Sequence, residues 1–155
     1  MRFRHLVAAV VLLCSIAATT GPVSAAEYAT KEEAVALVKS AIARVTEVGM
    51  DQAKVEFMDH SGKFVDRDLY LIVIARDGTR VVHGQNPKLV GKQYFDSIDV
   101  NGYEYGKAVQ QIVEGPGTGW ISFAFKDPIT GKVLPKEAYV ERAGNYAYIA
   151  GAYVR

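Results

Sequence analysis

Cysteine is almost absent from this chain, because Cys14 is its one occurrence in 155 residues. It lies within the first 25 positions, which have the features of a removable leader. If that leader is cut away, the remaining chain has no disulfide and no thiolate for catalysis or metal binding. Its fold must then be held by packing alone. A lipid anchor on Cys14 is disfavoured, because Leu13 precedes it where a lipidation signal needs a small residue.

A strong excess of charge is also absent. The chain has 18 Lys and Arg against 17 Asp and Glu, and loss of Arg2 and Arg4 with the leader would change the net charge from +1 to −1. The basic residues are spread singly from Lys31 to Arg155, without the cluster that follows a phosphate backbone. We therefore expect neither nucleic acid nor an anionic membrane surface as a partner.

Apolar runs of membrane-spanning length are missing. The longest apolar stretch, residues 6–18, is too short to cross a bilayer and follows the two N-terminal arginines. Val23-Ser24-Ala25 then has the small-x-small pattern that signal peptidase cuts. We predict a signal peptide at residues 1–25, with cleavage after Ala25 or Ala26. Residues 26–155 are then one periplasmic or secreted domain with no membrane span.

Motifs of enzymatic chemistry are missing as well. The sequence has no GxSxG nucleophile elbow, no dinucleotide fingerprint and no complete phosphate loop. Beyond the leader its histidines are His60 and His83, and neither has a Cys or carboxylate cluster at metal-ligand spacing. Residues 99–102 look like the start of a calcium loop but lack the remaining ligands, so they predict a turn. We expect no enzyme, no metal and no cofactor.

Helical patterns are present in three segments. Thr30 and Glu33 have the spacing of a capping box, and apolar residues then recur every three or four positions as far as Gly49. This pattern predicts a long amino-terminal helix. A shorter helix is predicted from Asp51 through Met58, and a third over residues 103–114.

A β-hairpin is predicted in the middle of the chain. Residues 69–75 and 80–83 are rich in β-branched side chains and flank the turn dipeptide Asp77-Gly78. Arg76 and Arg80 flank this turn, and we expect both to face water.

The rest of the chain predicts one long connection and three strands. Residues 84–102 are rich in Gly, Asn, Asp and Pro and predict an irregular loop with a short helical turn near 92–95. Strands are predicted at 120–126, 133–143 and 146–153, and their short connections favour antiparallel neighbours. The fold class is therefore α+β, with helices packed on an antiparallel sheet of about five strands.

Several different short motifs follow one another along the chain. They are Leu69-Tyr70-Leu71, Asp77-Gly78, His83-Gly84-Gln85-Asn86-Pro87, Leu89-Val90-Gly91-Lys92, Asp96, Asp99-Val100-Asn101-Gly102, Gly119-Trp120, Asp127-Pro128, Pro135-Lys136 and Tyr139-Val140. Together they resemble a single Cache sensory domain, of the subtype found in chemotaxis receptors and periplasmic sensors. The resemblance covers about Glu33 to Tyr153.

The resemblance implies a PAS-like fold, in which a long amino-terminal helix packs on a five-stranded antiparallel sheet. It also implies a pocket for a small carboxylate such as pyruvate, lactate or acetate. The chain ends two residues beyond Tyr153, so we expect a free-standing domain that signals through a separate membrane-bound kinase or chemoreceptor. Phe123 and Phe125 stand where the family often has tyrosine and tryptophan.

Lys136 and His83 are the first candidates for binding a carboxylate. An anion removed from water needs charge-assisted donors, and the Lys136 ammonium supplies them directly. His83 ends a predicted strand, from which a ring nitrogen can donate to a ligand oxygen. The alternatives are a solvated lysine and a histidine bonded to the backbone.

Aromatic residues complete the predicted site. Tyr70, Tyr139 and Tyr153 combine an apolar body with a polar tip, which suits a pocket wall. Trp120 is a further candidate for that wall, although strand alternation places it on the opposite face from Phe123 and Phe125. The alternative for each of these aromatic residues is a place in the core.

Two functions remain open from the sequence. The first is an extracytoplasmic sensor that binds a small organic acid and acts in signal transduction or chemotaxis through a partner. The second is a protein-interaction module with a vestigial pocket, which docks on a membrane-bound kinase or receptor.

Overall fold

The computed structural model describes residues 28–154, so the predicted signal peptide lies outside the described residues. Helix α1 (Lys31–Val48) begins with the predicted capping box: the Thr30 hydroxyl accepts from the Glu33 N–H, and the Glu33 carboxylate accepts from the Thr30 N–H. Gly49, at φ 80°, ends α1 and leads directly into α2 (Met50–Phe57). Within this part of the chain no helix is both long and apolar enough to cross a membrane.

A five-stranded antiparallel sheet lies at the centre of the fold, as predicted, in the order β4-β3-β7-β6-β5. Short turns join its last three strands, so each pairs with the next along the chain. The predicted central hairpin supplies β3 and β4, and β3 pairs with β7. The strands are β3 (Ile72–Ala75), β4 (Arg80–His83), β5 (Thr118–Lys126), β6 (Val133–Ala143) and β7 (Tyr146–Tyr153).

The strand predicted over residues 69–75 is interrupted at Leu71. Before it, β1 (Val65–Asp66) and β2 (Leu69–Tyr70) pair only with each other and form a small ribbon. Leu71 is fully buried, and its carbonyl accepts from the Gly84 N–H at 2.8 Å. Tyr70 therefore belongs to a different sheet from β3.

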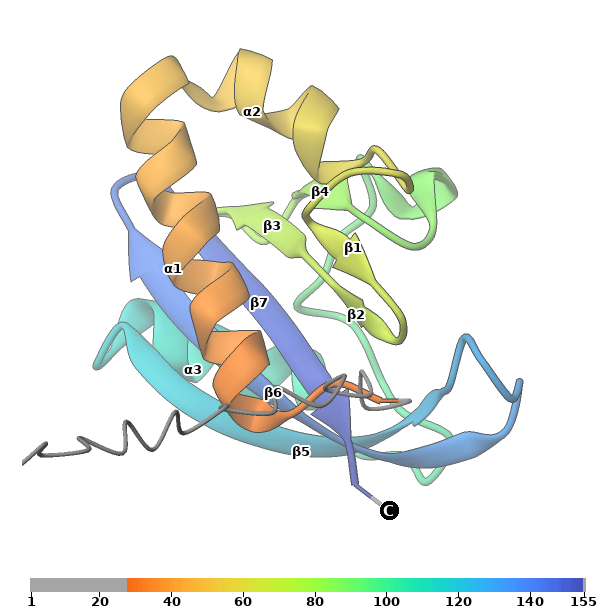
Figure 1. Cartoon of the computed structure of the whole chain (residues 1–155). Helices are drawn as coiled ribbons and strands as arrows, with labels where there is room; N and C mark the ends of the chain where they lie inside the picture. The colour runs from red at the N-terminus through yellow and green to blue at the C-terminus, as the bar shows by residue number, and fades with distance from the viewer. Residues whose placement is uncertain (1–27, 155) are drawn as a thin grey trace, which may run out of the picture.

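The two faces of the sheet bury two separate apolar cores. Figure 1 shows α1 in front of the sheet and α3 (Tyr105–Glu114) behind it. On the α1 face the core includes Phe57, Val73 and Tyr148, and on the α3 face it includes Ile74 and Val109. Fully burying an apolar side chain of this size stabilises the fold by about 1.5–3 kcal/mol.

An extra residue in β4 breaks the regular alternation of side chains. Val73 pairs with Val82, but Ile74 pairs with Arg80, so Val81 has no partner on β3. This is a β-bulge, which turns the following side chains to the other face of the sheet. Residues 81 and 82 therefore both pack toward α1, while Arg80 and His83 lie on the α3 face.

The long connection between β4 and α3 covers the α3 face of the sheet. Its helical turn is the 3-10 helix η1 (Pro87–Leu89), and not residues 92–95 as the sequence suggested. The reason is local: the Asn86 side chain accepts from the Lys88 N–H, and proline fits the first turn of a helix. The Tyr94 N–H donates to the Gly78 carbonyl at 2.8 Å, which ties this connection to the hairpin turn.

Candidate functional site

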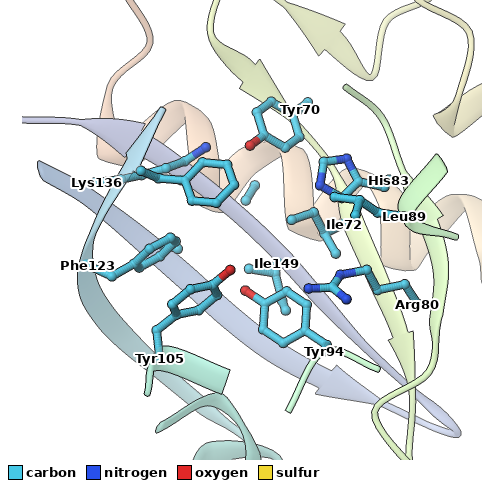
Figure 2. Close-up of a pocket in the computed structure, with 14 residues that line it drawn as sticks. Tyr70, Ile72, Arg80, His83, Leu89, Tyr94, Tyr105, Phe123, Lys136 and Ile149 are labelled. Carbon is cyan, nitrogen blue, oxygen red and sulfur yellow. The ribbon is translucent and has the colours of Figure 1, made fainter. Parts of the chain in front are cut away.

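A small cavity lies between the sheet and the long connection. Its volume is about 30 Å³, where about 10–15 Å³ suffices for one water, so it has room for two or three water-sized groups. Figure 2 shows polar side chains from several strands directed into this space. The lining residues that it labels are Tyr70, Ile72, Arg80, His83, Leu89, Tyr94, Tyr105, Phe123, Lys136 and Ile149.

Lys136 points into the cavity because even-numbered residues of β6 face α3. Its side chain is 4% exposed, and its ammonium lies 4.1 Å from the centre of the Tyr70 ring and 4.6 Å from that of Tyr153. Burial lowers the pKa of Lys136 to about 7, and the nearby carboxylates of Asp68 and Asp127 oppose this shift. Among residues 28–154, no carboxylate forms an ion pair with this ammonium.

Such a buried cation is costly unless an anion accompanies it. The ring faces of Tyr70 and Tyr153 attract the charge, and cation–π contacts of this kind contribute on the order of 0.5–2 kcal/mol. They do not accept the strong hydrogen bonds that an ammonium makes in water. The site is therefore suited to an acceptor that arrives with a ligand.

His83 presents a neutral donor to the same cavity. Its Nδ1 accepts from the Asn86 N–H at 3.0 Å, so the neutral ring carries its proton on Nε2. The ring is 3% exposed and stacks on Tyr70 with 5.3 Å between centroids. Burial, together with the charges of Arg80 and Lys136, lowers the pKa of His83 to about 4. At neutral pH His83 is an uncharged hydrogen-bond donor.

Tyr70 and Tyr153 surround the Lys136 ammonium. Tyr70 lines the cavity, whereas the Tyr153 hydroxyl donates to the Lys126 carbonyl at 2.7 Å. Burial raises the pKa of both phenols above the ordinary tyrosine value, so both stay protonated. The structure thus brings together four of the six residues selected from the sequence, with Tyr153 behind the lysine and not in the cavity wall.

Trp120 and Tyr139 are not brought to this cavity. They are partners in the β5–β6 register and lie on the face of the sheet that α1 covers. Their rings are 5.3 Å apart, and the Lys31 ammonium lies 4.5 Å from the Trp120 ring. The Tyr139 hydroxyl donates to Glu141 at 2.9 Å. Alternation along β6 explains this, because Tyr139 is three positions from Lys136 and points the other way.

Arg80 faces the cavity, so the expectation that it faces water is wrong. Its side chain is 7% exposed and donates to the Gln93 carbonyl and the Ser97 hydroxyl, both at 2.7 Å. The guanidinium also lies 4.6 Å from the centre of the Tyr94 ring. A bulge one residue away turns Arg80 inward, and no sequence signal marked that bulge.

Tyr94 and Tyr105 were not selected as site residues from the sequence, yet both line the cavity. Tyr94 comes from the long connection and Tyr105 from the first turn of α3. Tyr105 stacks on Phe123 with 4.3 Å between centroids, and Phe125 stands edge-on to it. The two phenylalanines thus form an apolar wall beside the polar groups.

Asp68 is a buried carboxylate behind the site. One of its oxygens accepts from the Ala29 N–H at 2.7 Å, while the other is enclosed and makes no hydrogen bond within the described residues. Its negative charge favours the charged form of Lys136. Residues 28–154 contain no cluster of three or more metal-ligating side chains.

An open cleft adjoins the cavity and provides access to it. The cleft shares Tyr70, His83, Leu89 and Phe125 with the cavity wall, and the turn at residues 127–131 forms its other side. A ligand can therefore reach the Lys136 ammonium between this turn and the start of the long connection.

Comparison with known proteins gives a match to one protein family. The family model described as single Cache domain 2 matches residues 10–154. No curated protein matches the chain at a significant level.

Three solved structures share the fold. A methyl-accepting chemotaxis protein from Vibrio parahaemolyticus superposes with a TM-score of 0.66 at 20% identity, over 79% of this chain and 87% of its own. A periplasmic sensor domain of a chemotaxis protein gives 0.61 at 24%, over 80% and 90%. A Cache chemosensory domain, described in terms of carboxylic acid recognition, gives 0.62 at 19%, over 80% and 88%.

Proposed function

This chain belongs to the single Cache domain 2 family, a family of sensory domains, and from that premise we propose that it is an extracytoplasmic sensor for a small carboxylate. The ligand is an organic acid of the size of acetate, lactate or pyruvate. The domain binds this acid and makes no covalent change to it.

The buried Lys136 ammonium carries this proposal. It has no acidic partner among residues 28–154 and shares its cavity with uncharged donors from His83 and Tyr70. A carboxylate placed there accepts from the ammonium, the imidazole Nε2–H and a phenol at once. Each charge-assisted hydrogen bond of this kind contributes about 1.5–3 kcal/mol.

The shape of the cavity limits the length of the ligand. The enclosed space of about 30 Å³ suits a few heavy atoms, and Phe123 and Phe125 offer an apolar wall to a short carbon chain. A structurally similar Cache domain is described as recognising carboxylic acids, which supports the same ligand class here.

The domain acts through a separate partner. One similar structure is a methyl-accepting chemotaxis protein and another is a periplasmic sensor domain of a chemotaxis protein, which supports a membrane-bound chemoreceptor as that partner. The leader at residues 1–25 exports residues 26–155 to the periplasm or the medium. Mass spectrometry of the secreted protein tests this: its amino terminus is expected at residue 26 or 27, and an intact Met1 terminus would contradict export.

Titration calorimetry against acetate, propionate, lactate and pyruvate tests ligand binding. Lys136→Ala is expected to weaken the best ligand about 10- to 100-fold, because it removes the charged donor. Lys132→Ala is the matched control, since Lys132 is exposed just before β6 starts. Equal affinity in wild type and Lys136→Ala would remove the ammonium from the mechanism.

Thermal unfolding with the same acids separates the sensor from an interaction module. A ligand that binds only the folded state must raise the melting temperature. If no acid changes the melting temperature of the wild type, the cavity is vestigial and docking on a membrane-bound partner becomes the better account.

A further inference from the structure

Arg80 is a second buried cation in the cavity without an acidic partner. Within residues 28–154 it takes part in no ion pair. Its guanidinium donates to the carbonyls of Lys92 and Gln93 and to the Ser97 hydroxyl. These bonds use three of the five N–H groups of an arginine, and none of the acceptors carries a charge. The positive charge is therefore solvated in part and neutralised by nothing in the described chain.

The two cations lie at opposite sides of the cavity. Figure 2 shows Lys136 and Arg80 directed inward from opposite walls, with His83 between them along the upper rim. They belong to β6 and β4, which are separated by β7 and β3 in the sheet. In the strand register Arg80 is level with Ile74, Ala147 and Arg142, so Lys136 lies three inter-strand steps, roughly 14 Å, across the sheet from it and six residues, roughly 20 Å, further along β6. A single carboxylate bound by Lys136 therefore leaves Arg80 without an anion.

Two phenol groups accompany Arg80 at its end of the cavity. Tyr94 lies under the guanidinium, and its ring meets that of Tyr105 edge to face at 5.8 Å. Figure 2 shows both hydroxyls directed toward the cavity. Within the described residues neither hydroxyl makes a hydrogen bond, and neither is among the fully enclosed unpaired atoms, so both are available to a ligand.

We propose that Arg80, Tyr94 and Tyr105 form a second anion subsite, and that the site therefore prefers a short aliphatic dicarboxylate of about the length of succinate to monocarboxylates such as acetate, lactate or pyruvate. This inference rests on the proposed function, because the first carboxylate occupies the Lys136 end. A dicarboxylate supplies one negative charge to each buried cation. Its short carbon chain lies against Phe123 and Ile149 in the cavity wall.

The test compares acids of equal chain length. Calorimetric titration of the wild type with succinate and with butyrate measures what the second carboxylate contributes. We expect succinate to bind at least about tenfold more tightly, in line with one or two charge-assisted hydrogen bonds. Malonate against propionate, and glutarate against valerate, then give the optimal length.

Two variants test whether the Arg80 guanidinium is responsible for the preference for succinate over butyrate. Arg80→Gln is expected to weaken succinate about 10- to 100-fold and butyrate less than about threefold. Arg76→Gln removes the same charge from an exposed position of the same hairpin and is expected to change neither affinity. Circular dichroism confirms that Arg80→Gln is folded, and the wild-type selectivity decides the question if it is not.

The possible outcomes distinguish failure of the second anion subsite from failure of the proposed carboxylate-sensor function. If the wild type binds butyrate as tightly as succinate, or if Arg80→Gln weakens both acids equally, the second subsite is refuted and the carboxylate sensor stands. If neither dicarboxylates nor monocarboxylates bind the wild type, the proposed function itself is wrong.

Discussion

Replacing Lys136 with methionine is expected to stabilise the unliganded protein and to remove a pH dependence from its stability. In the unfolded chain this lysine has an ordinary pKa near 10.5, whereas burial lowers its pKa to about 7 in the folded protein. Between these two values the unfolded state binds a proton that the folded state does not. Stability therefore rises with pH across this window, and below pH 7 the full cost of the buried ammonium remains.

The magnitude follows from the same two pKa values. One pH unit well inside the window changes the free energy of unfolding by about 1.4 kcal/mol, but at pH 7 the folded-state lysine is half protonated, so the wild type gains roughly 2.3 kcal/mol between pH 7 and pH 9. Above pH 9 tyrosines begin to contribute with the opposite sign, because burial raises the pKa of Tyr70 and Tyr153. The measurement therefore ends at pH 9.

Urea unfolding at pH 7, 8 and 9 provides the assay. The free energy of unfolding of Lys136→Met is expected to lack this rise, while Lys132→Met, altered at an exposed lysine, keeps the wild-type slope. Saturating acid should flatten the slope in the wild type as well, because a bound carboxylate holds Lys136 in its charged form. Parallel curves for wild type and Lys136→Met would refute the assignment of the buried charge to Lys136.

Two further predictions concern the walls of the site. His83→Ala removes one neutral donor and is expected to weaken acid binding about 2- to 10-fold by calorimetry, and an unchanged affinity would show that Nε2 does not reach the ligand. Gly78→Ala is expected to destabilise the fold by about 1–3 kcal/mol, because the residue has φ 85° and a Cβ would lie 2.1 Å from the Gln93 side chain. An unaltered melting temperature for Gly78→Ala would contradict that strain.

Much of the fold could be predicted because its signals are local. The capping box at Thr30 and the two short turns after residues 126 and 143 fix where α1 begins and where the last three strands reverse. The break at Leu71 could not be predicted, since residues 69–75 form one uninterrupted apolar run. What divides that run is the pairing of β2 with β1, a contact that periodicity does not reveal.

The candidate site could likewise be predicted from the sequence only in part. Lys136 and His83 were found through the family resemblance, and the structure places both in the cavity wall. Side chains alternate between the two faces of a strand, so the sequence alone already places Tyr139 and Lys136 on opposite faces of β6. Arg80 was missed because a charged residue beside a hairpin turn is usually solvated, and only the bulge at Val81 shows otherwise.

Val81 also sets how the site tolerates changes in length. Because it is the unpaired residue of β4, deleting it would leave Arg80 opposite Ile74 on the α3 face, whereas one residue inserted between Arg80 and Val81 would move Arg80 into the apolar layer beneath α1. A charge there would have neither water nor an acceptor. One inserted residue in this four-residue strand thus replaces a ligand contact with a buried, unsolvated charge, whereas deletion of Val81 or a substitution at position 80 leaves the strand register intact. Ligand preference in this domain can therefore diverge by replacement at position 80 but not by insertion in β4.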